Sequence, residues 1–302
     1  IAEIPTEQEI ESVFWSDNAL GIVVEGTEKA HELRVYDNKG NTEYTLEFDL
    51  DYSMLKFSGE NLLIYNDFEA TSCDWKENLD KNILEINHCR EGREGSTLLS
   101  GSCLYLGEGD LSIHTMDNCS PEMSFPLKHY RGISVVINLK IVAENPPEIL
   151  SESGIDILDF KEKFCAEGNC FVMRAKDEIE HIFSELYCVP DCLQKPYFKI
   201  KVQELFLFLC MVDVSKEKQR EQYTSPQVEV VREIHKKLTS NLQVRPTIEE
   251  LSKEYLINTA SLKDTFKGIY GQPIGAYMKE YRIKQAAVLL RQTQYTIAEV
   301  AN

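Results

Sequence analysis

The sequence predicts an α+β protein with more than one domain, and three observations lead to this prediction. Stretches of alternating apolar and polar residues recur over about the first 140 residues, as in β-strands. From Ile155 onward, apolar residues recur at helical spacing. From Thr247 onward, the chain carries the start and stop signals of two short helices followed by a longer one. A chain of 302 residues allows two or three domains.

The composition is that of a globular protein, with 43% hydrophobic and 27% charged residues. No run of 18 apolar residues and no signal peptide is apparent, so we expect a cytoplasmic location and no membrane partner. The missing initial Met and the abrupt end suggest a fragment. The net charge of −18 is unevenly distributed: residues 225–302 hold 11 Lys and Arg against 8 Asp and Glu, a net charge of +3. A mildly basic tail on an acidic body suits a DNA-binding module attached to a sensor.

Residues 1–66 are predicted to form a β-strand segment. Residues 37–40 (Asp-Asn-Lys-Gly) suit a hairpin turn, because glycine accepts positive φ. Trp15-Ser16, followed by Leu20, recurs 42 residues later as Phe57-Ser58, followed by Leu62, a spacing usual for one propeller blade. The segment resembles a piece of a β-propeller; the alternative is that it adds strands to the next domain. The expected strands are 20–25, 32–36, 43–48 and 61–65.

Short strands continue from about Asp67, each punctuated by Gly or Pro. Many short strands with close turns predict a sandwich or small barrel. The expected strands are 83–93, 104–113 and 125–138. Helices are expected at 155–164, 177–187 and 199–214, where apolar residues recur at helical spacing. The polar stretch 215–224 is predicted to be an interdomain linker. Pro226 then opens a further helix, with Val228, Val231, Ile234 and Leu238 inward.

Thr247 opens the first of the two short helices, because Glu250, three residues later, completes a capping box. Asn258 suits the N-cap of the second helix, and Gly271 suits its end. Two short helices with a tight turn form a helix-turn-helix, whose second helix would enter the major groove of DNA.

The second helix has two distinct faces. Leu262, Phe266 and Ile269 recur at i, i+4 and i+7 and must point inward. The opposite face combines small residues with two lysines, which suits a groove walled by phosphates. The alternative is an ordinary solvent-exposed helix face. The expected DNA contacts are Thr259, Ala260, Ser261, Lys263, Asp264 and Lys267.

The start of this module is repeated. Thr296-Ile-Ala-Glu299 repeats the capping box of Thr247-Ile-Glu-Glu250, and Pro273 starts a long helix between the two. Arg282 and Lys284, with Lys279, lie outside the apolar stripe of that helix, and we expect the first two to contact DNA. The inward stripe is expected at Ile274, Tyr277, Met278, Tyr281, Ala287 and Leu290.

Two helix-turn-helix starts bridged by one helix resemble the AraC/XylS family of bacterial transcription regulators. The phrase YGQPIGAYMKEYRIKQAAVLL is similar to the linker helix of that family, and the resemblance covers about residues 62–302. It implies a sensor with dimerisation helices at 67–214 and a DNA-binding domain at 225–302. The chain ends at Asn302, inside the first helix of the second unit. We therefore expect the second recognition helix to be absent and DNA binding to be weak.

The resemblance also implies a function. The sensor of this family is a cupin-like β-barrel that holds a small effector, and the apolar helix at 199–214 either joins two copies or packs on its own barrel. The expected partners are double-stranded promoter DNA, a small-molecule effector and a second copy of the chain, with RNA polymerase as a candidate. Enzymatic activity and cofactors are not expected. Arg90, Glu91 and Arg93 are the candidate effector contacts; a solvated charge cluster is the alternative.

Nine cysteines in a cytosolic chain predict free thiols. Cys165 with Cys170, and Cys188 with Cys192, leave a four-thiolate zinc site and a redox switch as alternatives. His88, His114 and His129 are isolated in the sequence, and we expect no metal site at them. The rival interpretation of the whole chain is a metal-dependent cupin enzyme, or a propeller-based binding protein with an incidental helical tail.

Overall fold

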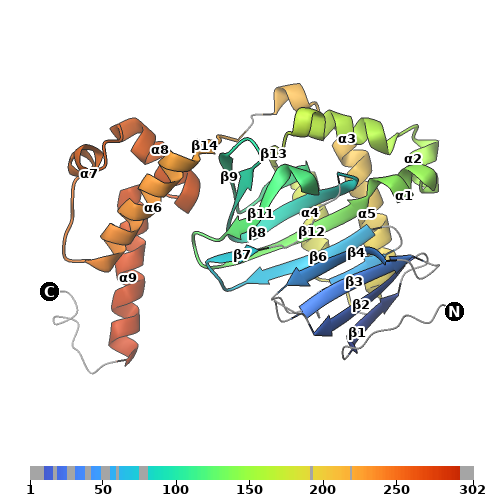
Figure 1. The fold of residues 1–302 in the computed structure, drawn as a ribbon, viewed down its shortest axis with the longest axis horizontal. Coiled ribbons are helices and arrows are strands. Elements are labelled where there is room, and N and C mark those ends of the chain that lie inside the picture. The colour runs from blue at the N-terminus through green and yellow to red at the C-terminus, as the bar shows by residue number, and fades with distance from the viewer. Residues whose placement is uncertain are drawn as a thin grey trace. The chain divides into compact units, whose positions relative to one another are not determined.

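The computed structural model describes residues 10–15, 19–25, 31–37, 42–48, 55–58, 61–74, 81–190, 193–217 and 220–292, and only the backbone path before Ile64. The described chain is mixed α/β, with antiparallel sheets followed by helices (Figure 1). It divides into two compact units. The first unit comprises residues 1–100 and 106–220, and the second unit comprises residues 101–105 and 221–302.

A four-stranded antiparallel sheet begins the first unit, in the order β1-β2-β3-β4. The motif that repeats after 42 residues falls on two hairpins with the same strand register. Trp15 lies opposite Leu20 in the first, and Phe57 lies opposite Leu62 in the second. The second of these hairpins, however, belongs to the large sheet. This agrees with the alternative expectation that the segment adds strands to the next domain. The propeller resemblance stays a prediction. The strands are β1 (Ile10–Trp15), β2 (Ala19–Glu25), β3 (His31–Asp37), β4 (Thr42–Phe48), β5 (Leu55–Ser58) and β6 (Asn61–Phe68).

The large sheet has ten strands, with the central order β13-β10-β8-β12-β6-β5. Two predicted strands are wrong in extent. The expected strand 104–113 is interrupted at residues 108–109, where φ of Gly109 is 73°, and its two parts, β9 and β10, each pair with β8 rather than with each other. The strand expected from 125 begins only at Tyr130. The strands are β7 (Ser72–Asp74), β8 (Ile83–Leu98), β9 (Ser102–Gly107), β10 (Asp110–Thr115), β11 (Cys119–Ser124), β12 (Tyr130–Asn138) and β13 (Phe171–Arg174).

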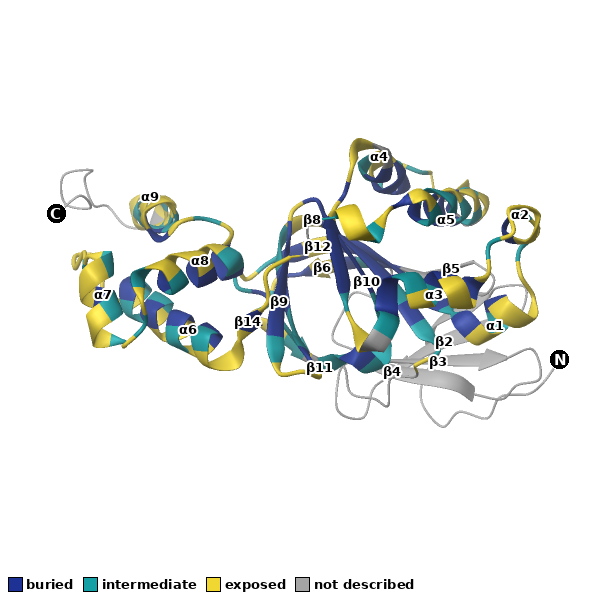
Figure 2. Cartoon of the chain, turned by 90° about the horizontal axis from the view of Figure 1, so that it is seen from above, coloured by how far each residue is buried: buried dark blue, intermediate teal, exposed yellow. Residues whose placement is uncertain are grey.

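Helices pack on the sheet of the first unit and share its apolar core. Val202, Leu205 and Leu209 of α5 are buried together with residues of β8, β10 and β12, so this helix packs on its own sheet (Figure 2). Ile200 on the same helix is exposed. The helices are α1 (Leu139–Glu144), α2 (Glu148–Glu152), α3 (Ile157–Cys165), α4 (Asp177–Leu186) and α5 (Gln194–Met211). Within the described ranges, no helix is both long and apolar enough to cross a membrane.

The second unit is helical, with α6 (Ser225–Ser240), α7 (Ile248–Glu254), α8 (Thr259–Tyr270) and α9 (Ile274–Gln292). Two short elements lie in or next to the predicted linker: Val214–Lys216 form a short 3-10 helix, and Tyr223–Thr224 form strand β14.

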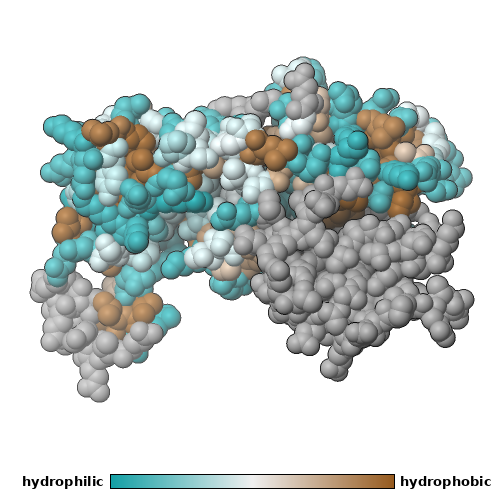
Figure 3. Space-filling model, viewed as in Figure 1, coloured by the Kyte–Doolittle hydropathy of each residue, from teal (hydrophilic) through white to brown (hydrophobic). Residues whose placement is uncertain are grey.

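The apolar stripe expected along α9 holds only in its first half. Ile274 and Met278 are buried, but Leu290 is 39% exposed and contradicts the stripe. The far half of α9 extends beyond α6 (Figure 1), and Figure 3 shows an apolar patch near its end. The repeated capping box at 296–299 lies outside the described residues.

Candidate nucleic-acid interface

The helix-turn-helix begins with the predicted capping box. The Thr247 hydroxyl accepts a hydrogen bond from the Glu250 backbone N–H at 3.2 Å, and the Glu250 carboxylate accepts one from the Thr247 N–H at 2.7 Å. These bonds satisfy two of the amide groups that a helix start leaves without intrahelical partners. They also lower the pKa of Glu250, whose charge suits a helix N-terminus.

The turn between α7 and α8 uses a residue with an unusual backbone conformation. Leu256 has φ of 51°, in the left-handed region that costs a residue with a Cβ roughly 1–2 kcal/mol. Its side chain is 93% exposed, so burial does not offset this cost. The turn is held instead by Ser252, whose hydroxyl donates to the Ile257 carbonyl at 2.6 Å.

Helix α8 is bounded as predicted. The Asn258 side chain accepts a hydrogen bond from the Ser261 N–H at 2.7 Å, and Gly271 ends the helix with φ of 80° while its N–H donates to the Lys267 carbonyl. Leu262, Phe266 and Ile269 are fully buried, and Thr265 between them is also buried. The inward stripe therefore fixes which face of α8 remains outside.

The outer face of α8 carries four of the six expected contacts. Ala260, Lys263, Asp264 and Lys267 are exposed. Thr259 and Ser261 are only half-buried. The Ser261 hydroxyl accepts a hydrogen bond from the Gln227 amide of α6 at 3.0 Å, so it is directed towards a neighbouring helix.

Arg282 and Lys284 on α9 differ from the residues of that face. The Arg282 Nε atom donates to the Leu242 carbonyl at 3.2 Å, which ties α9 to the loop after α6. Lys284 is exposed and forms an ion pair with Glu280 at 2.7 Å, one turn earlier on α9. DNA contact by either residue stays a prediction.

An aromatic cluster beneath α8 joins three helices. The His235 ring of α6 stacks on Tyr270 of α8, with centroids 4.3 Å apart, and its Nε2 atom is 2.9 Å from the Tyr277 hydroxyl of α9. Phe266 packs against Tyr270 at 4.6 Å. Sequence reasoning placed Tyr277 inward but missed His235, whose ring would have drawn attention only through its helical spacing from Val231 and Leu238.

A strand supplied by a distant part of the chain completes the second unit. Tyr223 pairs with Cys103 in antiparallel register, and the Ser225 hydroxyl donates to the Gly101 carbonyl at 2.8 Å. Tyr105 lies against Tyr223, with centroids 6.3 Å apart. The Tyr223 ring lies beside Gly268 of α8, where a Cβ atom would overlap it. Residues 101–105 are therefore part of the unit that carries α8.

Each of the three candidate effector contacts has a different near neighbour. The Arg90 guanidinium lies 4.1 Å from the centre of the Tyr187 ring, and Glu91 forms an ion pair with Arg131 at 3.1 Å. The Arg93 guanidinium lies beside Gly107. The structure thus distributes them among different neighbours, and their common role in binding an effector stays a prediction.

The interior of the first unit contains a polar chain that sequence reasoning missed. The Tyr130 hydroxyl donates to the Asn87 side chain at 2.7 Å, and Asn87 donates to Glu94 at 2.8 Å. Ser96 donates to the other Glu94 oxygen at 3.1 Å. Burial nevertheless raises the pKa of Glu94 to about 7. Only the alternation of Asn87 with apolar residues on β8 could have indicated an inward amide.

Asp110 organises the turn at residues 107–110 (Gly-Glu-Gly-Asp), between β9 and β10. Its carboxylate is buried, accepts a hydrogen bond from the Gly107 N–H at 2.9 Å, and forms ion pairs with Arg174 and Arg220. Arg220 is the last residue of the first unit. The turn thus anchors Arg220, within the stretch 215–224 that was predicted to be a linker.

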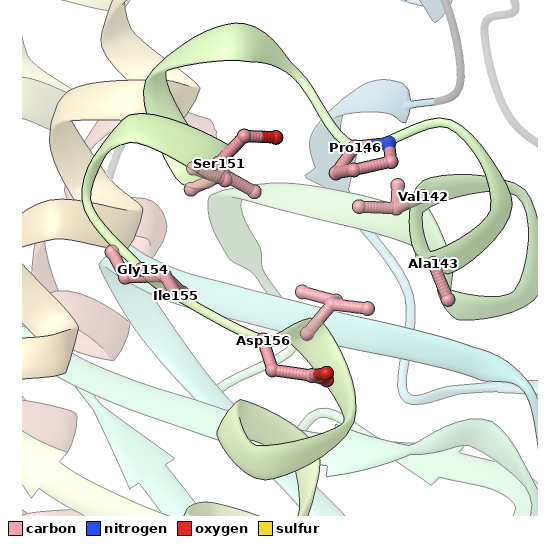
Figure 4. A pocket seen from close by; sticks show the side chains of 9 residues that line it. Val142, Ala143, Pro146, Ser151, Gly154, Ile155 and Asp156 are labelled. Carbon is pink, nitrogen blue, oxygen red and sulfur yellow. The ribbon is translucent and has the colours of Figure 1, made fainter.

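A cavity of about 220 Å³ lies elsewhere in the first unit, against α1, α2 and α3 (Figure 4). Its walls combine apolar side chains, such as those of Val142, Leu150 and Ile157, with oxygens from Ser151 and Asp156. The Asp156 carboxylate already caps α3 by accepting from the Leu158 N–H at 2.7 Å. None of the three candidate effector contacts lines this cavity.

The cysteines of the described chain are free thiols. Within that part of the chain, no group of three or more His, Cys, Asp or Glu side chains is arranged to hold a metal ion. His88 is buried, stacks on Phe183 and lies 3.3 Å from Glu180. Cys188 is exposed, and Cys192 lies outside the described residues.

Residues 1–84 match a family model described as "Family of unknown function (DUF5711)". No curated protein matches the chain in sequence. Similar solved structures include ToxT from Vibrio cholerae with bound unsaturated fatty acid, at 10% identity, 80% coverage of this chain, 84% of that chain and a TM-score of 0.35.

The AraC-like transcriptional activator CuxR has 12% identity, covers 86% of this chain and 82% of its own, and has a TM-score of 0.35. The EutQ protein of Clostridium difficile has 16% identity, 33% and 66% coverage, and a TM-score of 0.22. Scores this low carry no argument about the fold or function of the chain.

Proposed function

We propose that this protein is a sequence-specific DNA-binding transcription regulator in which α8 reads the major groove. The observation that carries the proposal is the outer face of α8. A capped helix-turn-helix holds α8 by a fully buried stripe, while Ala260, Lys263, Asp264 and Lys267 stand exposed on the other side. That arrangement offers a rigid helix with donors, an acceptor and a small residue to base edges.

The proposal includes a sensor in residues 67–214 that takes a small effector in a cupin-like barrel, and association as a homodimer. The acidic charge of the chain outside 225–302 supports a division into sensor and DNA-binding tail, because the acidic part would repel DNA and confine contact to the basic tail. The proposal is for a binding protein rather than an enzyme.

Individual side chains of α8 have separable roles in this proposal. Ala260 would touch a thymine methyl group, and Lys263 would donate to guanine O6 and N7. Asp264 would accept from cytosine N4, or hold Lys267. Lys267, one turn further along, would contact phosphate.

The test begins with selection of duplexes from a random DNA pool by the 302-residue chain. Lys263→Ala should cost roughly 1–3 kcal/mol of binding free energy on the selected site and relax discrimination at one base pair. Lys267→Ala should weaken binding to all duplexes about equally and reduce the salt slope by about one. The control is Lys236→Ala, which removes an exposed lysine from α6.

Selection without sequence enrichment, together with identical binding by all three variants, would exclude α8 as the reading helix.

A further inference from the structure

Leu256 occupies a position between α7 and α8 that glycine suits better than leucine. The Ile257 N–H donates to the Ser252 carbonyl at 3.2 Å, which is the closing bond of a Schellman motif at the end of α7. In this motif the residue before the bonded N–H is left-handed, and Leu256 has the corresponding positive φ of 51°. Because a Cβ atom makes this conformation costly, glycine would form the same turn with less strain.

The side chain of Leu256 does not stabilise the fold in return. It is 93% exposed, and no other large apolar side chain in the described chain is as exposed. The bonds that hold the turn are made by Ser252 and Ile257, through the backbone and through the Ser252 hydroxyl. Leu256 therefore combines a strained backbone with an exposed apolar side chain, and its own contacts offset neither cost. Uncompensated costs of this kind concentrate at functional sites.

The place of Leu256 in the chain indicates what the side chain contacts. It lies two residues before Asn258, the N-cap of α8, and thus within about 7 Å of that helix end along the backbone. The N-terminal residues of a recognition helix are the ones that approach base edges. Glu254, the carboxylate that precedes the turn, is paired with Lys237 of α6, so its charge is balanced where phosphate would approach.

We propose that Leu256 is a further specificity-determining residue, which packs against the C5-methyl group of a thymine at the edge of the DNA site. This role rests on the function proposed for α8. Thymine presents its methyl group in the major groove, where apolar side chains recognise it. The contact would remove apolar surface of both molecules from water. Because the turn is already hydrogen-bonded, binding would not have to order a flexible loop.

A protein partner that covers the apolar side chain is the competing explanation. The exposed face of α8 begins at Ala260, four residues after Leu256. Leu256 and this face can therefore meet the same stretch of groove, with Leu256 nearer its edge. A protein bound at Leu256 would have to share that space with the phosphate backbone that α8 approaches, which favours DNA as the occupant.

The first test uses the 302-residue chain and the duplex that it selects from a random pool. Each thymine of the site is replaced in turn by uracil, which removes the methyl group and keeps the base pair. At one position near an edge, this replacement should weaken binding of the parent about fourfold, as expected for one buried methyl group. Leu256→Ala should weaken binding to the thymine duplex and abolish the uracil effect at that position alone.

Val244→Ala is the matched control, because it shortens another exposed apolar side chain of the second unit, in the loop before α7. It should bind every duplex as the parent does. Unchanged binding by Leu256→Ala, with Lys263→Ala still weakened, would overturn this role of Leu256, favour a protein partner and leave the function of α8 intact. An equal loss on all duplexes would also overturn it, because it would indicate a contact with the sugar-phosphate backbone. If no sequence is enriched, both proposals fail.

Leu256→Gly separates the strain from the contact. Hydrogen-exchange protection of α7 and α8 in the free chain should rise roughly two- to fivefold, because glycine adopts positive φ without a Cβ clash. Binding should nevertheless weaken at least as much as in Leu256→Ala. Lys128→Gly relieves the second non-glycine residue with positive φ in the described chain and should leave every uracil effect unchanged. Lower protection in both Leu256 variants would assign the side chain a structural role and overturn the proposal.

Discussion

At the scale of single residues, the buried carboxyl of Glu94 couples the stability of the first unit to pH. Its folded-state pKa of about 7 lies above the ordinary value of 4.5, because burial penalises the charged form. Between these two values the folded chain keeps a proton that the unfolded chain has released. The free energy of unfolding should therefore fall as the pH rises from about 4.5 to about 7, by up to roughly 3 kcal/mol.

Glu94→Gln should remove this dependence, since an amide keeps the shape without the charge. Urea denaturation of the unaltered chain and of Glu94→Gln at pH 5 and pH 8 measures the difference between them. We expect the variant to gain stability relative to the parent at pH 8. Glu108→Gln, which changes an exposed carboxylate, should follow the parent. A difference between Glu94→Gln and the parent that is the same at both pH values would contradict the role of Glu94.

At the scale of secondary-structure elements, Gly268 determines how closely β14 approaches α8. A Cβ atom at this position would overlap the Tyr223 ring, whereas a Cβ atom at Gly275 of α9 would meet no atom within 4 Å. Gly268→Ala should therefore destabilise the second unit by roughly 1–3 kcal/mol through overpacking. Gly275→Ala should be neutral or stabilising by up to about 1 kcal/mol, because alanine favours the helix.

Thermal unfolding of the two alanine variants provides the measurement. A double-mutant cycle with Tyr223→Ala isolates the contact, since the cost of Gly268→Ala should disappear once the ring is removed. The same cost with and without the ring would place its cause elsewhere.

An element could be predicted from the sequence when the residues that determine it lie close together along the chain. Thr247 caps α7 with Glu250, three residues away, and the buried stripe of α8 spans Leu262 to Ile269, so both helices could be predicted. The exposed face of α8 followed from the same periodicity. Strand β14 could not be predicted, because its partner Cys103 lies more than a hundred residues earlier.

The expected site residues also fall into two groups: those placed by the local helical period and those bonded to distant parts of the unit. Lys263, Asp264 and Lys267 are exposed as the helical period requires. Ser261 and Arg282 bond instead to Gln227 and to the Leu242 carbonyl, which belong to other parts of the unit and give no local signal. The extent of the 104–113 strand was wrong because Gly109, with positive φ, interrupts the strand between β9 and β10.

At the scale of the whole molecule, the second unit is assembled from two separated stretches of chain. Residues 221–302 expressed alone would lack the strand that pairs with Tyr223 and the Gly101 carbonyl that accepts from Ser225. We expect lower hydrogen-exchange protection of α6 and α8 in this fragment than in the full chain, because a backbone pair and the burial of Tyr223 are lost.

A second fragment provides the control, with residues 101–105 joined ahead of residue 221 by a flexible Gly-Ser linker. Protection should recover in this form, because the linker raises the effective concentration of the missing strand. Equal protection in all three proteins would show that residues 101–105 contribute nothing to the stability of the helices.

The discontinuous second unit has a consequence for how such a gene can change. Exchange of regulatory modules by recombination needs one breakpoint that separates them cleanly, and here the chain passes between the units at residues 100–101, 105–106 and 220–221. A crossover near residue 220 would deliver α6 to α9 without the strand beside Tyr223. The recipient would have to encode a substitute strand in its own sensor. The coding regions of the two units are therefore expected to be inherited together. Chimeras between distant relatives should be selected against.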